Sequence, residues 1–296
     1  MQNNFCIICG KSNVKVVGKK GILHKLGEPM NITNVICLNC GLVFLNPRPS
    51  PSEYDNLYKK YGEIRHSLKD KEAIISFIKF AEKKKKGSDV LEFIKKICHP
   101  GSHILDIGCG LGTIIHLLKE NLGYTVFGIE PDRFLAQIVS AHYGFPVFGG
   151  TLEEFLEQPI NKKFDFIILH HVFEHFVDPL NKLKELESLL SSRGVIYIEV
   201  PNIVDFKKPA DRFFDILHPY SYSPATLNKV LNLGGFKIIA WNEAKKKRIQ
   251  ILAARTESTV IALQNKEFNY QKIVSKTLNY LRKRRFIDLI KRTWPH

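Results

Sequence analysis

The stretch Ile104-Leu-Asp-Ile-Gly-Cys-Gly-Leu-Gly-Thr113 decides the fold, because an apolar run here ends in a glycine-rich loop. An apolar run bounded by glycines predicts a buried strand, and the spacing of apolar residues over 114–120 predicts a helix behind it. Gly108, Gly110 and Gly112 allow a sharp turn and let a ligand approach without a Cβ in the way. We therefore expect a strand, a tight turn and a helix that together bind a nucleotide-like ligand.

Two acids near the loop narrow the ligand. A second strand is predicted over 125–129 and ends in Glu130, about 20 residues after the loop, where a carboxylate can bind both hydroxyls of a ribose. Asp106 precedes the glycines, and a fixed negative charge there opposes a pyrophosphate but suits a cationic ligand. The G-x-G-x-G spacing also differs from the G-x-G-x-x-G of dinucleotide-binding enzymes. A glycine turn in some other α/β protein is the alternative.

The loop resembles motif I of the class I S-adenosylmethionine-dependent methyltransferases, and Glu130-Pro131-Asp132 resembles the acidic motif that follows their second strand. The resemblance implies S-adenosylmethionine as cofactor, a ligand with a sulfonium and an amino group. The residues expected to bind it are Asp106, Gly108, Cys109, Gly110, Gly112, Glu130, Pro131, Thr151, Leu152 and His170. Cys109 is expected only to pack within the loop.

The rest of the core alternates between strand and helix patterns, which is typical of a parallel sheet. Asp178-Pro179 and Ser223-Pro224 each place a capping side chain before a proline, and so predict two helix starts. We expect an α/β fold, a Rossmann-like methyltransferase core with a mostly parallel seven-stranded sheet and helices on both faces. Strands are predicted at 103–107, 125–129, 146–148, 164–169, 194–200, 236–241 and 249–255, and helices at 112–121, 132–143, 151–157, 179–191 and 224–233.

Composition sets the broad class. The chain has 296 residues, 44% of them apolar and 25% charged, as in an ordinary globular protein. No apolar run is long enough to span a membrane, and the N-terminus lacks a signal-peptide pattern, so a cytoplasmic protein is expected. The formal charge of +15 favours anionic partners, although runs such as 245–248 are usually solvated faces.

Four of the six cysteines form two C-x-x-C-G motifs, Cys6-Ile-Ile-Cys9-Gly10 and Cys37-Leu-Asn-Cys40-Gly41. Two residues between thiolates let a tight turn place both sulfurs on one tetrahedral metal, and the glycine accommodates the positive φ of the knuckle. The pattern predicts a structural zinc ribbon, with a hairpin formed by 14–17 and 32–36. A disulfide pair is the alternative, disfavoured because no secretion signal is present.

Four regions are expected: a zinc ribbon at 1–48, a linker and helical cap at 49–100, the S-adenosylmethionine-binding core at 101–257 and a basic amphipathic tail at 258–296. In methyltransferases, helices such as those of the second region often cover the cofactor pocket; a helical linker that merely packs is the alternative. The mixture of basic and apolar residues in the tail predicts one or two helices. These helices are expected to bind a membrane surface, pack on their own domain or contact a second subunit.

The strand at 164–169 delivers His170-His-Val-Phe-Glu-His175 to its C-terminal end, where open parallel sheets build ligand sites. H-x-x-E-H also matches a zinc peptidase signature, but that signature needs a continuous helix, and here the helix starts only at Asp178-Pro179. The segment instead resembles the "H-x-x-E-H, then D-P" signature of methyltransferases that act on small molecules, sugars and glycans. Their later elements are matched by Glu199-Val-Pro-Asn202 and by His218-Pro-Tyr-Ser-Tyr-Ser223.

The ribbon, linker and core resemble the N-terminal layout of nucleotide-sugar C-methyltransferases, which carry a further C-terminal domain. This chain ends too soon to contain one, so we expect O-methylation of a sugar or related hydroxyl. His171 is the first candidate for general base, with His175 or His218 next, and Glu174 is expected to orient a histidine or bind a hydroxyl. Hydrogen-bonded structural histidines are the alternative.

Other functions stay open. Glu174, His175 and His218 partly resemble the metal sites of certain quinone-precursor and small-RNA 2′-O-methyltransferases, which would place a second, divalent metal at the active site. The ribbon and the basic charge suggest an RNA methyltransferase as second choice, and a non-catalytic ligand-binding protein is the third. The expected partner is an anionic small-molecule or glycan acceptor; peripheral contact with the inner membrane face and a homodimer are secondary expectations.

Overall fold

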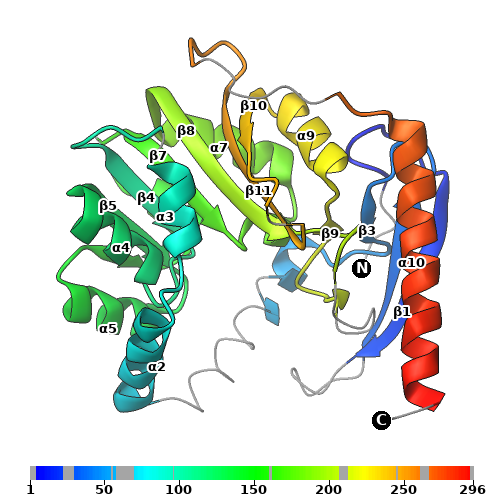
Figure 1. Cartoon of the computed structure of the whole chain (residues 1–296), viewed down its shortest axis with the longest axis horizontal. Coiled ribbons are helices and arrows are strands. Elements are labelled where there is room, and N and C mark those ends of the chain that lie inside the picture. The colour runs from blue at the N-terminus through cyan, green and yellow to red at the C-terminus, as the bar shows by residue number, and fades with distance from the viewer. Residues whose placement is uncertain are drawn as a thin grey trace.

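A seven-stranded sheet forms the centre of the computed structural model, in the order β10-β11-β8-β7-β4-β5-β6 (Figure 1). The pairs β4·β5, β4·β7, β5·β6 and β7·β8 are parallel, and β11 is antiparallel to both of its neighbours, β8 and β10. The predicted mostly parallel, Rossmann-like sheet is therefore confirmed. Its strands are β4 (His103–Ile107), β5 (Thr125–Glu130), β6 (Val147–Gly149), β7 (Phe164–His170), β8 (Leu190–Pro201), β10 (Phe236–Trp241) and β11 (Arg248–Arg255).

The structure describes residues 5–22, 30–54, 56–57, 70–95, 97–159, 162–206, 213–244, 246–260 and 267–293. Tyr58 and Tyr61 of the predicted helical cap, Lys245 of the basic run and Trp294 of the tail lie outside these ranges. The helices are α2 (Lys71–Lys83), α3 (Ser88–Ile94), α4 (Thr113–Leu122), α5 (Arg133–Tyr143), α6 (Leu152–Leu156), α7 (Pro179–Leu189), α9 (Pro224–Leu233) and α10 (Tyr270–Thr293), with a 3₁₀ turn η1 (Phe173–His175).

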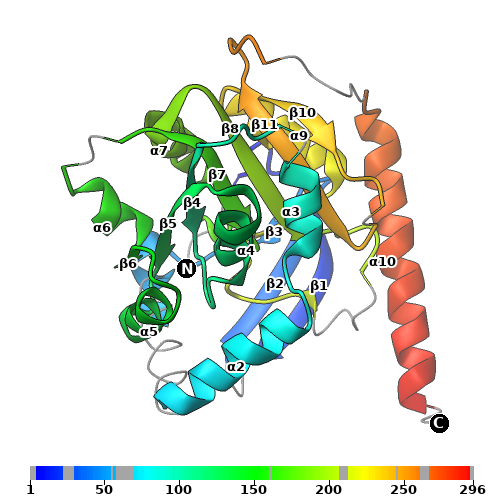
Figure 2. The ribbon, with the colours of Figure 1, turned by 60° about the vertical axis from the view of Figure 1, so that its left-hand side comes forward.

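Helices cover both faces of the sheet, and Figure 2 shows α3 and α4 in front of it and α7 and α9 behind it. Successive strand side chains point to opposite faces, so Val195 and Tyr197 of β8 pack with α2 to α5, whereas Ile196 and Ile198 pack with α7 and α9. Burial on both sides explains why these strands read as nearly continuous apolar runs.

The predicted helix starts are confirmed. Asp178 accepts a hydrogen bond from the Asn181 amide ahead of Pro179, and Ser223 accepts one from the Thr226 amide ahead of Pro224. Because α7 begins only at Pro179, residues 170–175 are strand end and 3₁₀ turn, so the continuous helix that a zinc peptidase needs is absent from this described segment.

The two cysteine motifs lie in turns next to a second sheet, β1-β2-β3-β9. Its strands are β1 (Val14–Ile22), β2 (Met30–Cys37), β3 (Val43–Leu45) and β9 (Tyr220–Ser221). The predicted hairpin is longer than expected. The edge strand β9 pairs with β3 and comes from the segment after His218. The N-terminal module, which is the part of the chain up to β3, therefore shares one sheet with the segment that covers the core.

Helix α10 packs on this second sheet (Figure 1). Val274 and Leu281 are buried in one cluster with Val17, Ile36 and Val43. The described part of α10 presents Lys272, Lys276, Arg282 and Lys283 as exposed residues on the other side. Of the residues that the structure describes, none forms a helix both long and apolar enough to cross a membrane.

Helix α2 lies in the region where helices were predicted, and two of its apolar side chains are exposed. Phe77 and Phe80 of α2 fit the helical pattern, but they are 49% and 53% exposed, because Ile74, Ile78 and Ala81 form the buried face of that helix.

The end of α7 offers a test of the packing. Arg255 of β11 donates to the carbonyl oxygens of Glu187 and Leu190 at 2.9 Å and of Ser191 at 2.7 Å, and so joins β11 to the end of α7, which lies before the predicted residue 191. We expect Arg255→Ala to lower the free energy of unfolding by about 1–3 kcal/mol in urea denaturation. Arg193→Ala, at an exposed position, is the control, and equal effects of the two variants would contradict this role for Arg255.

Candidate functional site

The glycine loop between β4 and α4 has the backbone that its sequence predicts. Gly108, Gly110 and Gly112 have φ of +69°, +54° and +69°, the left-handed region that favours glycine. A Cβ on Gly108 would lie 2.7 Å from Val172 Cγ2, and one on Gly112 would lie 2.6 Å from Val139 Cγ1. A Cβ on Gly110 would meet nothing within 4 Å, so this glycine faces open space from which a ligand can approach.

Asp106 is the most unusual group of the loop. It is 1% exposed, and neither carboxyl oxygen has a hydrogen-bond partner among the described residues. Burial, and next the negative charge of Glu130, raise the pKa of Asp106 well above its ordinary value. A cationic ligand that donates hydrogen bonds would satisfy this buried carboxyl, and the open side of Gly110 leaves room for such a ligand.

Glu130 closes the loop from the neighbouring strand. Its Oε2 accepts from the Gly110 amide at 2.9 Å and its Oε1 from the Asp132 amide at 3.1 Å. Two backbone amides thus hold the carboxylate at the C-terminal end of β5, the place expected for an acid that binds a ribose.

The other residues that are expected to bind the cofactor have different environments. Cys109 lies against Gly128 of β5, where a Cβ would stand 2.8 Å from its Sγ, so its thiol packs as expected. Pro131 is exposed after β5. Thr151 caps α6 through a capping box, and Leu152 is buried. His170 ends β7, and its Nε2 lies 3.4 Å from Glu199 Oε1.

Glu199 is the centre of a buried polar network at the ends of β7 and β8. It is fully buried and accepts hydrogen bonds from the Tyr197 hydroxyl at 2.7 Å, from Arg248 Nη1 at 2.6 Å and from the side-chain amide of Gln250. Burial opposes its ionisation, but hydrogen bonds from His170 and His171 hold the pKa of Glu199 well below its usual range. Arg248 and Gln250 are functional neighbours that the sequence reasoning missed, since the run at 245–248 has the appearance of a solvated face.

His171 lies between two carboxylates. Its Nδ1 is 3.2 Å from Glu174 Oε1, its Nε2 is 3.2 Å from Glu199 Oε1, and its φ of +59° is rare for a residue with a side chain. Burial would lower the pKa of His171, but hydrogen bonds to Glu174 and Glu199 raise it to about 9. An imidazolium with both nitrogens engaged has no lone pair to offer, so the geometry argues against His171 as general base. The geometry fits a structural role in which His171 holds Glu174 and Glu199 in place.

Glu174, His175 and His218 form the second cluster, brought together from η1 and from the segment before β9. One ligand atom of each lies within 4.8 Å of the others. The His175 Nδ1 lies 2.8 Å from the Leu217 carbonyl oxygen, which can only accept, so Nδ1 carries the proton and Nε2 is the acceptor nitrogen of neutral His175. The two imidazole rings lie 4.7 Å apart.

The protonation states in this cluster differ from that of His171. Burial, and next the charge of His175, lower the pKa of His218 to about 4, so His218 is neutral at physiological pH. Glu174 is 2% exposed, and its Oε2 has no hydrogen-bond partner among the described residues. The cluster therefore combines a neutral imidazole with a buried carboxylate whose second oxygen is unsatisfied.

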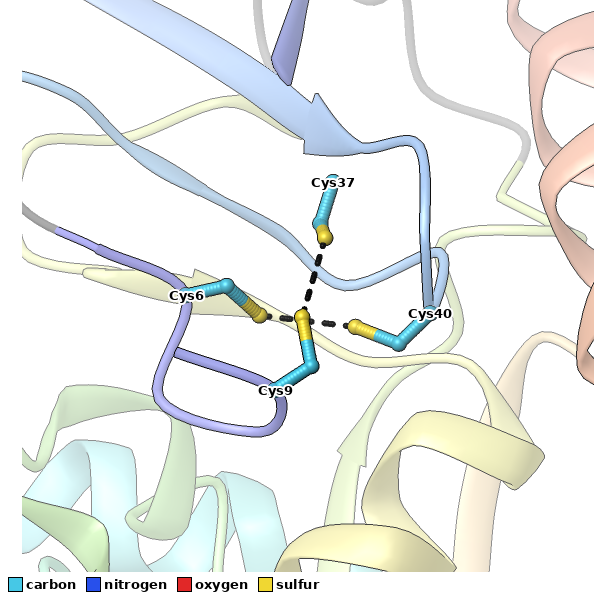
Figure 3. A group of neighbouring side chains, drawn as sticks. All are labelled: Cys6, Cys9, Cys37 and Cys40. Carbon is cyan, nitrogen blue, oxygen red and sulfur yellow. Dashed lines mark hydrogen bonds between the residues drawn. The ribbon is translucent and has the colours of Figure 1, made fainter. Parts of the chain in front are cut away.

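The four cysteines converge on one point, as Figure 3 shows. The Sγ atoms of Cys6 and Cys40 are 3.4 Å apart, those of Cys9 and Cys37 are 3.5 Å apart, and all four lie within 4.8 Å of one another. None is in a disulfide. Tetrahedral zinc with Zn–S bonds of about 2.3 Å would space its sulfurs by about 3.8 Å, so the four thiols could hold one such ion.

The turns of this cysteine centre match the prediction. Gly10 and Gly41 have φ of +66° and +81°. Each donates its amide to the carbonyl of the first cysteine of its motif, Gly10 to Cys6 at 2.8 Å and Gly41 to Cys37 at 2.9 Å. Four thiolates would leave no open coordination position, which fits a structural ion.

The ion pairs of His171 give a testable titration. With selectively labelled histidine, we expect the NMR resonance of His171 to titrate near pH 9, and the ordinary value of 6.5 would contradict the arrangement. Because the folded-state pKa is the raised one, the stabilisation from these pairs is complete below about pH 6.5 and is lost as the pH rises through about 9. Glu199→Gln should lower the midpoint, whereas Glu157→Gln, at an exposed site, should leave it unchanged.

Comparisons with known proteins match the part of the chain that forms this site. A family described as "Methyltransferase domain" matches residues 69–240. Among solved structures, a SAM-dependent methyltransferase from Aquifex aeolicus is 20% identical, with 62% of this chain and 98% of that chain covered and a TM-score of 0.49. A chain from the complex between the Haloferax volcanii Trm112 methyltransferase activator and a putative methyltransferase is 13% identical, with 61% and 94% covered and a TM-score of 0.49.

The glycopeptide N-methyltransferase MtfA is 12% identical, with 57% of this chain and 90% of that chain covered and a TM-score of 0.45. No curated protein matches. The family match spans more than half of the chain and includes the glycine loop, the strand-end histidines and the segment around His218. The chain therefore belongs to the methyltransferase-domain family and is a methyltransferase.

Proposed function

We propose that the chain transfers a methyl group from S-adenosylmethionine to a hydroxyl of a sugar, a glycan or a related small molecule. The observation that carries the proposal is the buried, unpartnered carboxyl of Asp106 beside the open face of Gly110. It lies next to a strand end that presents histidines and buried acids. A cation-binding cofactor site beside a proton-accepting cluster is the pair of features that this reaction needs.

The residues present fit the cofactor. Asp106 would accept from its ammonium group, Glu130 would bind the ribose hydroxyls, and the glycine loop would line its path. The cofactor supplies a methyl group already activated on a sulfonium. The protein has to hold the acceptor oxygen in line and remove its proton.

His218 is our revised choice of general base, with His175 next. Its pKa, lowered to about 4, leaves its lone pair available at neutral pH, whereas that of His171 is occupied by a proton. A weak base suffices, because the hydroxyl proton becomes strongly acidic as the oxygen gains a methyl group. Glu174 would receive a hydrogen bond from an acceptor hydroxyl at its unsatisfied Oε2.

The charge at this edge of the sheet supports an anionic acceptor. The turn between β10 and β11 lies at the C-terminal ends of the parallel strands, because β11 runs antiparallel to β8. Asn202 holds the turn by donating its amide to the Lys247 carbonyl at 3.1 Å and its side chain to the Lys246 carbonyl at 2.8 Å. Both lysines are exposed there and would attract a phosphate or carboxylate on the acceptor.

A metal-assisted reaction is the second candidate, favoured by one observation. Glu174, His175 and His218 supply one carboxylate and two imidazoles within 4.8 Å, a donor set that suits several divalent metals. A bound ion there would lower the pKa of the acceptor hydroxyl, and His218 would then be a ligand rather than a base.

The open face of Gly110 gives a direct test of cofactor binding. We expect Gly110→Ala to raise the Kd for S-adenosylmethionine at least tenfold by calorimetry, because the added Cβ fills space that the ligand needs. Gly123→Ala is the matched control, since Gly123 also has a left-handed φ of +63° and nothing within 4 Å of a Cβ, but lies at the far end of α4. Equal affinity of the two variants would contradict the site.

The reaction is tested with methyl-labelled cofactor and pools of sugar nucleotides, glycans and RNA. We expect label in a sugar-containing pool. His218→Gln should reduce turnover at least 100-fold with the Kd for the cofactor unchanged, since a general base contributes about 10²–10⁴-fold. His142→Gln, on the exposed side of α5, is the control.

Other outcomes decide among the alternatives. Label in RNA would replace the sugar acceptor, and loss of turnover on chelation with recovery on adding Mg²⁺ or Mn²⁺ would favour the metal-assisted reaction. Cofactor binding without label in any pool would favour a non-catalytic protein. Full activity of His218→Gln would remove His218 as base.

A further inference from the structure

We infer that the four-cysteine centre is a positioning element for the acceptor side of the active site: its metal holds the segment 216–222, with His218, against the end of β7. The inference rests on the proposed function for the role of His218 and on zinc as the ion between the cysteines. It assigns the N-terminal module a role inside its own chain rather than as a docking site for a partner.

The cysteine centre sets the position of β3. Cys37 ends β2 and donates its amide to the Leu42 carbonyl at 2.9 Å, so the turn that carries Cys40 leads directly into β3. The other turn, with Cys6 and Cys9, faces it across sulfur distances of 3.4 and 3.5 Å. A metal ion would be the covalent-strength connection between these two turns.

Strand β3 in turn holds the segment that carries His218. It pairs with β9 at Val43↔Ser221 and Phe44↔Tyr220, and the Leu45 amide donates to the Pro219 carbonyl at 3.0 Å. Pro219 directly follows His218. Backbone hydrogen bonds from the ribbon therefore begin one residue after the proposed base.

Two side chains that follow β3 in the chain, Arg48 and Tyr54, hold the same segment. Arg48 Nη1 donates to the Tyr220 hydroxyl at 2.5 Å and the guanidinium lies 5.0 Å from the centre of that ring, while the Tyr220 hydroxyl donates to the Val177 carbonyl at 3.1 Å. Tyr54, 1% exposed, donates its hydroxyl to the Ile216 carbonyl at 2.8 Å. His218 thus lies between Ile216, which Tyr54 holds, and Tyr220, which Arg48 holds.

The segment reaches the catalytic cluster through direct contacts. His175 donates to the Leu217 carbonyl, and the buried ring of Tyr222 lies 5.6 Å from the ring of Phe173 in η1. Cys6, Cys37 and Cys40 are buried in the same apolar cluster as Phe173, Tyr220 and Tyr222. A continuous packed path therefore joins the sulfurs to Glu174 and His175.

The glycine loop is held mainly by β5 and α5. The Gly108 and Cys109 amides donate to the Ile129 carbonyl at 2.8 and 3.0 Å, the Gly110 amide donates to Glu130, and Gly112 lies against Val139. Small modules with few buried strands depend on their metal for stability. Loss of the ion should therefore loosen β3, β9 and residues 216–222 while the cofactor loop keeps its structure.

The test compares hydrogen exchange in the full chain, with zinc bound and after removal by a chelator under reducing conditions. We expect amides of 216–222 to exchange at least tenfold faster without zinc, and those of 106–113 to change less than twofold. His218 should also become reactive to diethylpyrocarbonate, measured by mass spectrometry, with exposed His142 as internal reference. The Kd for S-adenosylmethionine should change less than threefold.

Variants distinguish a change in the position of residues 216–222 from a loss of the overall fold. Tyr220→Phe keeps the ring but loses the hydroxyl bonds to Arg48 and Val177, so it should accelerate exchange of 216–222 with zinc retained. Cys37→Ser should reproduce the effect of chelation, whereas Cys98→Ser, outside the cysteine centre, should not.

Three results would overturn the inference: protein with reduced cysteines that carries no metal, unchanged exchange of 216–222 after proven zinc loss, or equal loss of protection throughout the core. Failure of the proposed function would give a different result. If the protein binds no S-adenosylmethionine, yet 216–222 responds to zinc, the coupling holds and the assigned reaction is wrong.

Discussion

The site depends on one buried ionisable group, the carboxyl of Asp106 at the end of β4. A carboxyl that is 1% exposed and has no hydrogen-bond partner among the described residues costs free energy in the ligand-free protein. The surrounding backbone explains why it is kept. Three glycines in the left-handed region bend the chain away from Asp106, and the Gly110 amide aims Glu130 at the same edge. The arrangement is preorganised for a ligand that carries positive charge and hydroxyl groups.

A second set of buried acids organises the acceptor side. Glu174 and Glu199 come from η1 and β8, and the imidazolium of His171 joins them, so that the ends of two strands are held together electrostatically. Gln250 extends this network to Asp89 of α3 at 3.2 Å, which connects it to the helices over the other face of the sheet. His171 in this role is a structural cation, and in the proposed reaction the proton acceptor is His218, whose pKa is lowered to about 4.

Much of the fold is predictable from local sequence. The apolar runs of β4, β7 and β8, the capped prolines at 179 and 224 and the glycine turns at 10 and 41 are each decided by neighbouring residues. The sheet also depends on pairings that local patterns do not specify. The position of β11 between β8 and β10, and the addition of β9 to the sheet of the ribbon, depend on contacts between residues far apart in sequence.

The same limit applies to the choice of general base. The string His170 to His175 suggests that His171 is a reactive histidine, because its acidic neighbour Glu174 looks like an orienting group. The register of β7 on β8 pairs His170 with Glu199 and so brings a second carboxylate to His171. Local sequence also predicts a separate ribbon, whereas Tyr220 and Arg48, distant in sequence, connect that ribbon to the site.

The most direct test of the account is calorimetric titration of S-adenosylmethionine into the wild-type protein and into Asp106→Asn, which keeps the shape of the side chain and removes its charge. The account predicts one cofactor per chain for the wild type and at least tenfold weaker binding for the variant, with no loss of thermal stability. No binding by the wild-type protein, or equal affinity in both proteins, would contradict it.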